Sequence, residues 1–250
     1  MSAAPAPSSG RRVLVTGAAS GIGAAVAARF AANGDRVAGL DRDEDGLRDA
    51  ELEVAIACDV RQEASVAGAV ERAASALGGL DVLVNAAGVS GRGTVVDLEV
   101  DEWDRVFEIN ARGPYLVARH AVPHLRRAGG GTIVNLASQL GLVAAPNATA
   151  YCASKGAAIQ LTRAMAIDLA PDAITVNAVC PGPTDTPMLR SYFDSSPAPQ
   201  DERAAFEATM LTGRFVAAQE IAEAVFNLAH PLARSTTGST VVVDGGYVTR

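Results

Sequence analysis

The feature that most restricts the fold of this chain is a repeated alternation of short apolar segments with longer helical ones. Seven short segments, rich in β-branched residues, have the length of strands, and the segments between them show helical spacing of apolar residues. The strand segments are apolar on both faces, as in parallel strands that helices cover on both sides. The sequence therefore predicts an α/β fold with one doubly wound parallel sheet and helices on both faces.

The boundaries of these segments follow from the pattern. Strands are predicted at residues 11–17, 35–41, 53–60, 80–88, 131–138, 174–182 and 239–246. Helices are predicted at residues 22–33, 63–77, 101–110, 115–126, 149–169 and 219–229, and the charged segment between the second and third strands has room for another. Residues 181–214 are Pro-rich, and we expect an irregular segment that serves as a substrate lid over about residues 183–215.

Composition limits the architecture and the partners. The chain has 250 residues, of which 49% are hydrophobic, so we expect residues 11–250 to form one domain after a flexible tail at residues 1–10. With 21 basic and 28 acidic residues the net charge is −7, which argues against nucleic acid and anionic membranes as partners. The uncharged stretch 128–154 is interrupted by Gly, Asn, Gln and Pro, and this argues against a membrane span.

The cysteines bear on the compartment. Cys58, Cys152 and Cys180 are odd in number and show no CxxC spacing. The N-terminal residues contain no apolar run of signal-peptide length. We therefore expect reduced thiols and a cytoplasmic protein.

A glycine-rich turn separates the first predicted strand from the first predicted helix. Gly17, Gly21 and Gly23 stand in the segment TGAASGIG. A backbone that passes close to a pyrophosphate requires residues without Cβ, and the helix start behind the turn offers free N–H groups and a positive dipole end. The turn therefore favours a dinucleotide site, although a plain tight turn is the alternative for a chain with 24 glycines.

An acidic residue at the end of the second predicted strand refines the cofactor. Asp41 lies 24 residues after Gly17, near the spacing at which a carboxylate accepts hydrogen bonds from the adenosine ribose. A carboxylate there repels a 2′-phosphate, so the sequence favours NAD over NADP. Arg42 is the counter-argument, since a guanidinium beside the strand can hold that phosphate, and a solvated turn is a third interpretation.

Taken together, these motifs resemble the classical short-chain dehydrogenase/reductase family, which has a Rossmann fold, over about residues 12–248. The matching segments are Gly17 to Gly23 (including Ser20 and Ile22), Asp59 and Val60, Asn85 to Gly88 (including Ala86), and Pro181 to Pro187 (including Gly182, Thr184 and Thr186). The resemblance implies that these segments hold the dinucleotide, with Asp59 and Val60 at the adenine and Thr186 at the carboxamide. Asn110, Ser138, Tyr151 and Lys155 match the family's catalytic tetrad in order and spacing.

The tetrad residues permit a definite chemistry. A free phenol has a pKa near 10 and is a weak base, but Lys155, one helical turn from Tyr151, supplies an ammonium that stabilises the phenolate. Tyr151 then removes the hydroxyl proton in alcohol oxidation and returns it in ketone reduction, while Ser138 holds the substrate oxygen. By resemblance, Lys155 also holds ribose hydroxyls and Asn110 anchors a water linked to Lys155. Taken singly, Ser138 is equally a turn hydroxyl and Asn110 a core amide.

Three functions remain in competition. The first is oxidation of a secondary alcohol or reduction of a ketone with NAD, the second a 3-oxoacyl-thioester (acyl-carrier-protein) reductase with NADPH, and the third a dinucleotide sensor without turnover. Gln139, Asn147 and Met188 are candidate substrate contacts for a small or medium, neutral, partly apolar substrate.

Other side chains receive structural interpretations. No metal site is expected, because His120, His124 and His230 lack ligand spacing. Trp103 and Phe107 stand at helical spacing and are interpreted as core. The resemblance implies a homo-oligomer, commonly a tetramer, that assembles through the helices after Gly113 and Thr149 and the C-terminal segment.

Overall fold

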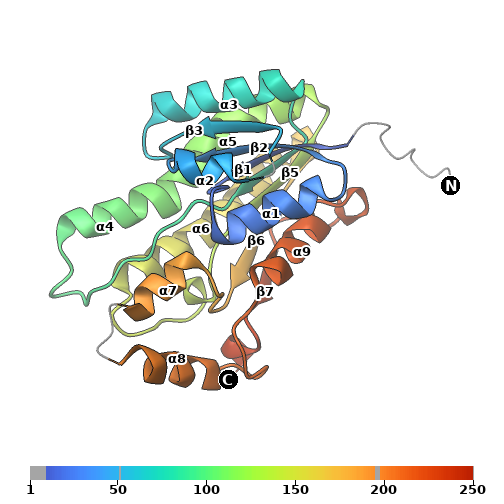
Figure 1. The fold of residues 1–250 in the computed structure, drawn as a ribbon. Helices are drawn as coiled ribbons and strands as arrows, with labels where there is room; N and C mark the ends of the chain where they lie inside the picture. The colour runs from blue at the N-terminus through green and yellow to red at the C-terminus, as the bar shows by residue number, and fades with distance from the viewer. Residues whose placement is uncertain (1–9, 51, 195–197, 250) are drawn as a thin grey trace.

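Seven parallel strands form one sheet in the order β3-β2-β1-β4-β5-β6-β7 (Figure 1). The computed structural model describes residues 10–50, 52–194 and 198–249, so the predicted tail lies almost wholly outside the described residues. The strands are β1 (Arg12–Thr16), β2 (Arg36–Asp41), β3 (Val54–Ala57), β4 (Val82–Asn85), β5 (Gly131–Leu136), β6 (Ile174–Pro181) and β7 (Thr240–Val243). From β1 the chain adds β2 and β3 on one side, and it then adds β4 to β7 on the other side. This reversal confirms the predicted doubly wound sheet.

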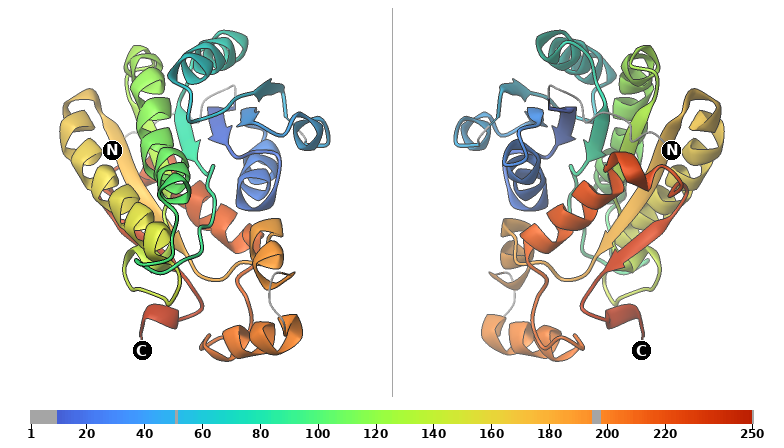
Figure 2. Two further views of the ribbon diagram at one scale, coloured as in Figure 1. Left: turned by 90° about the vertical axis from the view of Figure 1, so that its left-hand side faces the viewer. Right: turned by 90° about the vertical axis from the view of Figure 1, so that its right-hand side faces the viewer.

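Helices cover both faces of this sheet. They are α1 (Gly21–Ala31), α2 (Glu44–Arg48), α3 (Glu63–Leu77), α4 (Val100–Phe107), α5 (Gly113–Arg127), α6 (Thr149–Leu169), α7 (Pro187–Asp194), α8 (Pro199–Ala208) and α9 (Ala218–Leu228). Figure 2 shows α3, α5 and α6 along one face and α1 and α9 on the other. Every predicted helix is present, with ends that differ by a few residues.

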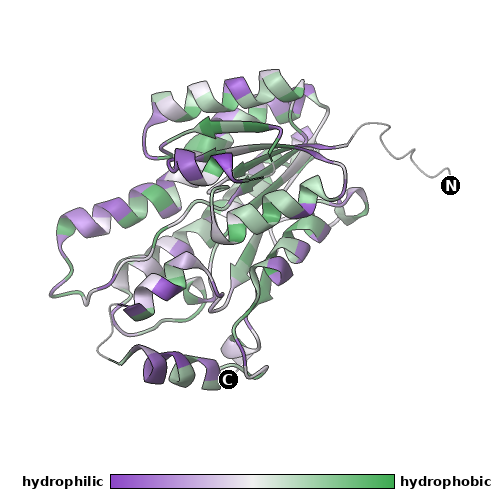
Figure 3. Cartoon of the chain, in the orientation of Figure 1, coloured by the Kyte–Doolittle hydropathy of each residue, from purple (hydrophilic) through white to green (hydrophobic). Residues whose placement is uncertain are grey.

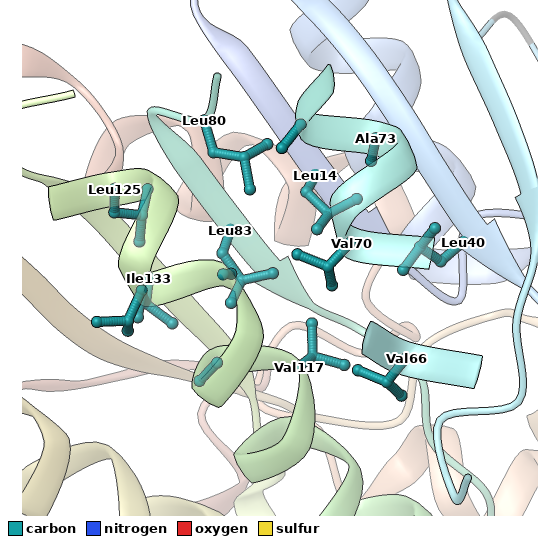
Figure 4. Close-up of a cluster of buried hydrophobic side chains, with 14 of the residues drawn as sticks. Leu14, Leu40, Val66, Val70, Ala73, Leu80, Leu83, Val117, Leu125 and Ile133 are labelled. Carbon is teal, nitrogen blue, oxygen red and sulfur yellow. The ribbon is translucent and has the colours of Figure 1, made fainter. Parts of the chain in front are cut away.

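The two largest apolar clusters of the described residues lie on the two faces of the sheet. In the first, Leu14 and Leu83 of the sheet pack against Val70 of α3 and Val117 and Leu125 of α5 (Figure 4). The second joins the opposite face of the sheet to α1 and α9. Because adjacent strand residues enter different clusters, the strands are apolar along both faces, as the sequence predicted.

The helices predicted at 101–110 and 115–126 are parts of one helical run. A π-helical turn, Glu108–Arg112, connects α4 directly to α5. Pro114 stands in the first turn of α5, where the missing N–H is tolerated. The interpretation of Trp103 and Phe107 as core is wrong: they are half-buried and stack on each other, with 4.6 Å between ring centroids.

The prediction that residues 181–214 are irregular is also wrong, because the segment contains α7 and α8. Pro187 and Pro199 each stand at the start of a helix, where proline is favoured. Phe193 of α7 is buried against Phe206 of α8 and stacks on Phe215. Figure 3 shows α8 as largely hydrophilic outside these contacts, which explains its weak apolar periodicity.

Two features of the described residues bear on location. None of the helices there combines the length and the apolar character needed to cross a membrane. Cys58, Cys152 and Cys180 are free cysteines, and Cys58 and Cys180 are buried. The prediction of reduced thiols agrees with these positions.

Candidate active site

A cavity of about 810 Å³ lies beyond the carboxyl ends of the strands. Its walls are the glycine turn, the segments that follow β2 to β6, the start of α6, and parts of α7 and α8. Parallel sheets place ligands at this edge. The fold thus brings the predicted glycine motif and three tetrad residues, Ser138, Tyr151 and Lys155, into one cavity.

The glycine turn is closed by close backbone contacts. Gly17 has φ +70°, and a Cβ on Gly23 would lie 2.0 Å from the carbonyl oxygen of Gly17. The Thr16 hydroxyl accepts hydrogen bonds from the N–H groups of Ala86 and Ala87, both at 3.1 Å. These bonds hold the segment after β4 beside the turn, so the two predicted cofactor motifs form one surface.

The start of α1 faces the cavity. Ser20 occupies the N-cap position, yet its side chain makes no capping hydrogen bond, and Ile22 lies in the first turn. The helix has no acidic residue in its first turn. An N-terminus with a positive dipole end and no competing carboxylate suits the pyrophosphate of a dinucleotide.

Asp41 is held at the rim of the cavity by the backbone. Its carboxylate accepts hydrogen bonds from the N–H of Ala19 at 3.1 Å and from the N–H of Asp43 at 3.0 Å. Arg42 also lines the cavity and is exposed. The carboxylate is thus fixed against the glycine turn.

The segment predicted to contact adenine contains an ion pair that the sequence did not reveal. The carboxylate of Asp59 accepts hydrogen bonds from Arg61, the shortest at 2.7 Å, and this pairing lowers the pKa of Asp59. Arg61 and Val60 line the cavity beside it. Because Asp59 is already paired, its predicted contact with adenine has to share the carboxylate with Arg61.

Tyr151 and Ser138 form the centre of the site. Tyr151 stands in the first turn of α6, and Ser138 follows β5, with its hydroxyl accepting from the N–H of Leu140 at 3.1 Å. Burial raises the pKa of Tyr151, and a hydrogen bond from the Ser138 hydroxyl opposes this rise. The phenol and the hydroxyl therefore present a polar pair to whatever oxygen enters between them.

Lys155 lies buried behind Tyr151. Its side chain is 5% exposed, its Nζ donates to the carbonyl oxygen of Leu136 at 2.8 Å, and Nζ lies 5.8 Å from the centre of the Tyr151 ring. Burial lowers the pKa of Lys155 to about 8. An ammonium can donate three hydrogen bonds, and that of Lys155 donates one of them to Leu136. Lys155 also lines the cavity.

Asn110 lies in the π-helical turn, apart from the cavity wall. Its side chain donates to the carbonyl of Val89 at 2.9 Å and to the hydroxyl of Ser154 at 3.1 Å, and it accepts from the N–H of Val89 at 2.9 Å. These bonds tie the segment after β4 to α6. A Cβ on Gly88 would lie 3.3 Å from Asn110 Oδ1 and 3.4 Å from Lys155 Nζ, so Asn110 remains close to Lys155.

The other predicted cofactor residues are divided between two walls. Ala86 and Gly88 follow β4 and line the cavity, whereas Asn85 is the last residue of β4, is buried in the sheet and does not line the cavity. Pro181, Gly182, Thr184 and Thr186 form the opposite wall. Thr186 lies across from the glycine turn, since a Cβ on Gly21 would come within 3.4 Å of it.

The proposed substrate residues all line the cavity. Gln139 is 4% exposed and its Oε1 has no hydrogen-bond partner among the described residues, whereas Asn147 and Met188 are exposed. The lining residues that the sequence missed include Arg92, Tyr192, Glu202, Phe206 and Tyr247.

A charged cluster stands among the missed residues. Arg92 lies 3.8 Å from Glu202 and over the Tyr192 ring, so this end is more polar than expected. No sequence signal could have joined these residues, because they come from separate segments.

The described part of the chain offers no metal site. No group of three or more His, Cys, Asp or Glu side chains there has the arrangement of metal ligands. His120 and His124 of α5 each lie near one glutamate of α3, Glu63 at 3.6 Å and Glu71 at 3.4 Å. Single carboxylates at these distances form ion pairs with a protonated histidine.

Comparisons with known proteins agree with this geometry. Residues 17–248 match the family model described as Enoyl-(Acyl carrier protein) reductase. The chain is 39% identical to a 2-(R)-hydroxypropyl-CoM dehydrogenase of Xanthobacter autotrophicus, over 95% of this chain and 98% of the relative. It is 41% identical to a cis-4-hydroxycyclohexanecarboxylate dehydrogenase of Sinomonas cyclohexanicum, over 95% and 96%. A solved 3-ketoacyl-(acyl-carrier-protein) reductase of Brucella melitensis, complexed with NADH, superposes with a TM-score of 0.88 at 36% identity, over 96% and 98%.

Proposed function

Since the chain belongs to the short-chain dehydrogenase/reductase family of oxidoreductases, we propose that it transfers a hydride between NAD and a secondary alcohol or ketone. The observation that carries this proposal is the meeting of Ser138 and Tyr151 with the buried Lys155, whose Nζ lies 5.8 Å from the centre of the Tyr151 ring. All three line one cavity with the glycine turn. This constellation offers a proton donor and acceptor at the place where a carbonyl oxygen would be held.

The proposed mechanism divides the work among these side chains. A bound nicotinamide supplies the hydride donor or acceptor. Ser138 donates a hydrogen bond to the substrate oxygen, and Tyr151 gives its phenolic proton to that oxygen in reduction or takes it in oxidation. The charge of Lys155 stabilises the phenolate that reduction leaves behind. Asn110 holds α6 and the segment after β4 together through Ser154 and Val89.

The preference for NAD rests on Asp41. Its carboxylate is fixed against the glycine turn, where a ribose 2′-phosphate would meet like charge. Ser20, the glycines and the start of α1 would hold the pyrophosphate, and Lys155, Thr184 and Thr186 would lie toward the nicotinamide. The solved relative of 36% identity is complexed with NADH.

The proposed substrate is a small or medium hydroxy compound. Two relatives that match almost the whole chain are named as dehydrogenases of 2-(R)-hydroxypropyl-CoM and of cis-4-hydroxycyclohexanecarboxylate. Gln139, Asn147 and Met188 would contact it, together with Arg92 and Tyr192 at the far end of the cavity. We expected a neutral, partly apolar substrate, and the Arg92–Glu202 pair adds an end that would accept a polar substituent.

A 3-oxoacyl-thioester reductase is the second candidate, favoured by the solved 3-ketoacyl-(acyl-carrier-protein) reductase of 36% identity. Asp41 argues against the NADPH that we expect of this activity. A sensor that binds the dinucleotide without turnover is the third candidate, and the presence of the whole tetrad argues against it.

The test is a titration of the purified protein with NADH and NADPH, followed by nicotinamide fluorescence, and then assays with cyclic ketones, keto acids and a 3-oxoacyl thioester. We expect tighter binding of NADH and reduction of a ketone in preference to the thioester. Preference for NADPH with the thioester would favour the second candidate, and binding without turnover of any substrate would favour the sensor.

We also propose a homotetramer in the cytoplasm. Tyr115 of α5 and Ile167 of α6 are 45% and 76% exposed, which supports burial of these helices against a second copy. Light scattering after size-exclusion chromatography is expected to give four times the mass of 25.5 kDa. A monomer mass would contradict the assembly.

A further inference from the structure

A line of buried hydrogen bonds joins the sheet to α6, and two of its three side chains lie outside every motif considered above. Asn85 Nδ2 donates to Asn135 Oδ1 at 2.9 Å, and Asn135 Nδ2 donates to Thr162 Oγ1 at 2.9 Å. The Thr162 hydroxyl donates to the carbonyl of Ala158 at 2.8 Å. The three side chains are between 0 and 2% exposed. Polar groups in such a place destabilise the fold unless they are paired, so the line calls for an explanation.

The line connects the elements that carry the site. Asn85 and Asn135 are directly paired in the register of β4 and β5. Asn85 precedes the cavity wall at Ala86, and Asn135 lies three residues before Ser138. Thr162 lies on α6, seven residues or two helical turns after Lys155, and therefore on the same face of the helix.

A second polar contact joins α6 to the same strand. Lys155 Nζ donates to the carbonyl of Leu136, the residue that follows Asn135. The helix is thus fastened to neighbouring residues of β5 at two points, two turns apart. One contact fixes only the distance between the helix and the strand at that point. Two contacts, two turns apart, also fix the angle between the axis of a rigid helix and the strand.

The angle matters because Tyr151 lies one turn before Lys155, on the side away from Thr162. A tilt of α6 about the Lys155 contact would move the phenol relative to Ser138, which is anchored on β5. A displacement of about 1 Å between reacting groups lowers rates by about 100-fold. Packing of apolar side chains alone permits small shifts of this kind more readily than a directional hydrogen bond does.

We propose that Asn135 and Thr162 are positioning residues, which set the angle of α6 to β5 and so hold the phenol of Tyr151 at Ser138. The inference rests on the proposed function, since it gives both residues a part in the same proton transfer. Neither residue lines the cavity, and both act through the helix that carries Tyr151.

The test compares substitutions of Thr162. Thr162→Val keeps the shape and removes the hydroxyl, Thr162→Ala removes it without filling the space, and Thr162→Ser restores it. Thr132→Val is the matched control, because Thr132 and Thr175 form a hydroxyl pair at 3.1 Å between β5 and β6, away from the cavity. Thr162→Val and Thr162→Ala remove the two hydrogen bonds of the Thr162 hydroxyl, and Thr132→Val removes the one hydrogen bond to Thr175.

Three quantities are measured for each variant: NADH affinity, kcat for ketone reduction, and titration of Tyr151 by tyrosinate absorbance against a Tyr151→Phe reference. For Thr162→Val and Thr162→Ala we expect kcat to fall about 10-fold or more and the Tyr151 titration to shift, with NADH affinity within about two-fold. Thr162→Ser and Thr132→Val are expected to keep all three near the wild type.

The inference is overturned if the Thr162 variants lose only stability, and match Thr132→Val in kcat and in the Tyr151 titration below the unfolding temperature. The absorbance titration requires no substrate. If the wild type reduces no ketone, the proposed function fails, while the titration still decides whether Thr162 positions Tyr151.

Discussion

Replacement of Lys155 by methionine is expected to stabilise the folded protein near neutral pH while it removes activity. The ammonium is buried, and burial lowers the pKa of Lys155 from its usual 10.5 to about 8. A pKa lowered by two to three units corresponds to roughly 3 kcal/mol, at about 1.4 kcal/mol per unit. Methionine fills a similar volume without a charge, so at about pH 7 the variant avoids this penalty.

The sign of the pH dependence follows from proton binding. Below about pH 8 the lysine is protonated in both the folded and the unfolded chain, and the wild type bears the full penalty. Between about pH 8 and 10.5 the unfolded chain binds more protons than the folded one, so wild-type stability relative to the variant rises with pH. The lost hydrogen bond to Leu136 offsets the variant's gain by about 1 kcal/mol at every pH.

The assay is denaturant unfolding of both proteins at a fixed concentration under reducing conditions, at about pH 7 and about pH 10.5. The free energy of unfolding of Lys155→Met minus that of the wild type is expected to fall by roughly 3 kcal/mol between these pH values. Groups common to both proteins largely cancel in this difference. An equal difference at both pH values would refute the argument that a buried ammonium is kept for function at the expense of stability.

Three further predictions concern the cofactor site and the proton transfer. Asp41→Ser is expected to raise the affinity for NADPH relative to NADH by about 10-fold in a fluorescence titration, and an unaltered ratio would make Asp41 a turn residue only. Gly23→Ala is expected to abolish NADH binding or folding, because its Cβ would lie 2.0 Å from the Gly17 carbonyl, whereas Gly68→Ala, in open space, leaves both intact. Initial rates of alcohol oxidation should rise with pH as Tyr151 loses its proton, and rates of ketone reduction should fall; parallel or flat profiles would contradict its role.

Much of the fold could be predicted from the sequence because local patterns agree with tertiary structure along most of the chain. The segments 131–138 and 174–182 are apolar on both faces, and only a parallel sheet covered on both sides buries such strands. The glycine turn and the Tyr–Lys spacing were visible for the same reason, since a helical turn joins Tyr151 to Lys155 and a strand-to-helix turn holds the glycines.

The wrong predictions and the missed contacts have a physical cause as well. The prolines at 187 and 199 indicated an irregular segment, yet at the first position of a helix proline costs no hydrogen bond. The Arg92–Glu202 pair and the Asn135–Thr162 bond join residues distant in the sequence. Such contacts depend on how elements pack, and no local pattern encodes them.

Tyr151 is the group proposed to transfer the proton, and Tyr151→Phe tests this role most directly. NADH binding and ketone reduction are measured on the same sample of wild type and variant. We predict that the variant binds NADH within about two-fold of the wild type while ketone reduction falls by about 100-fold to 10,000-fold. Ketone reduction at the wild-type rate would contradict the account, because no proton donor would then be missing.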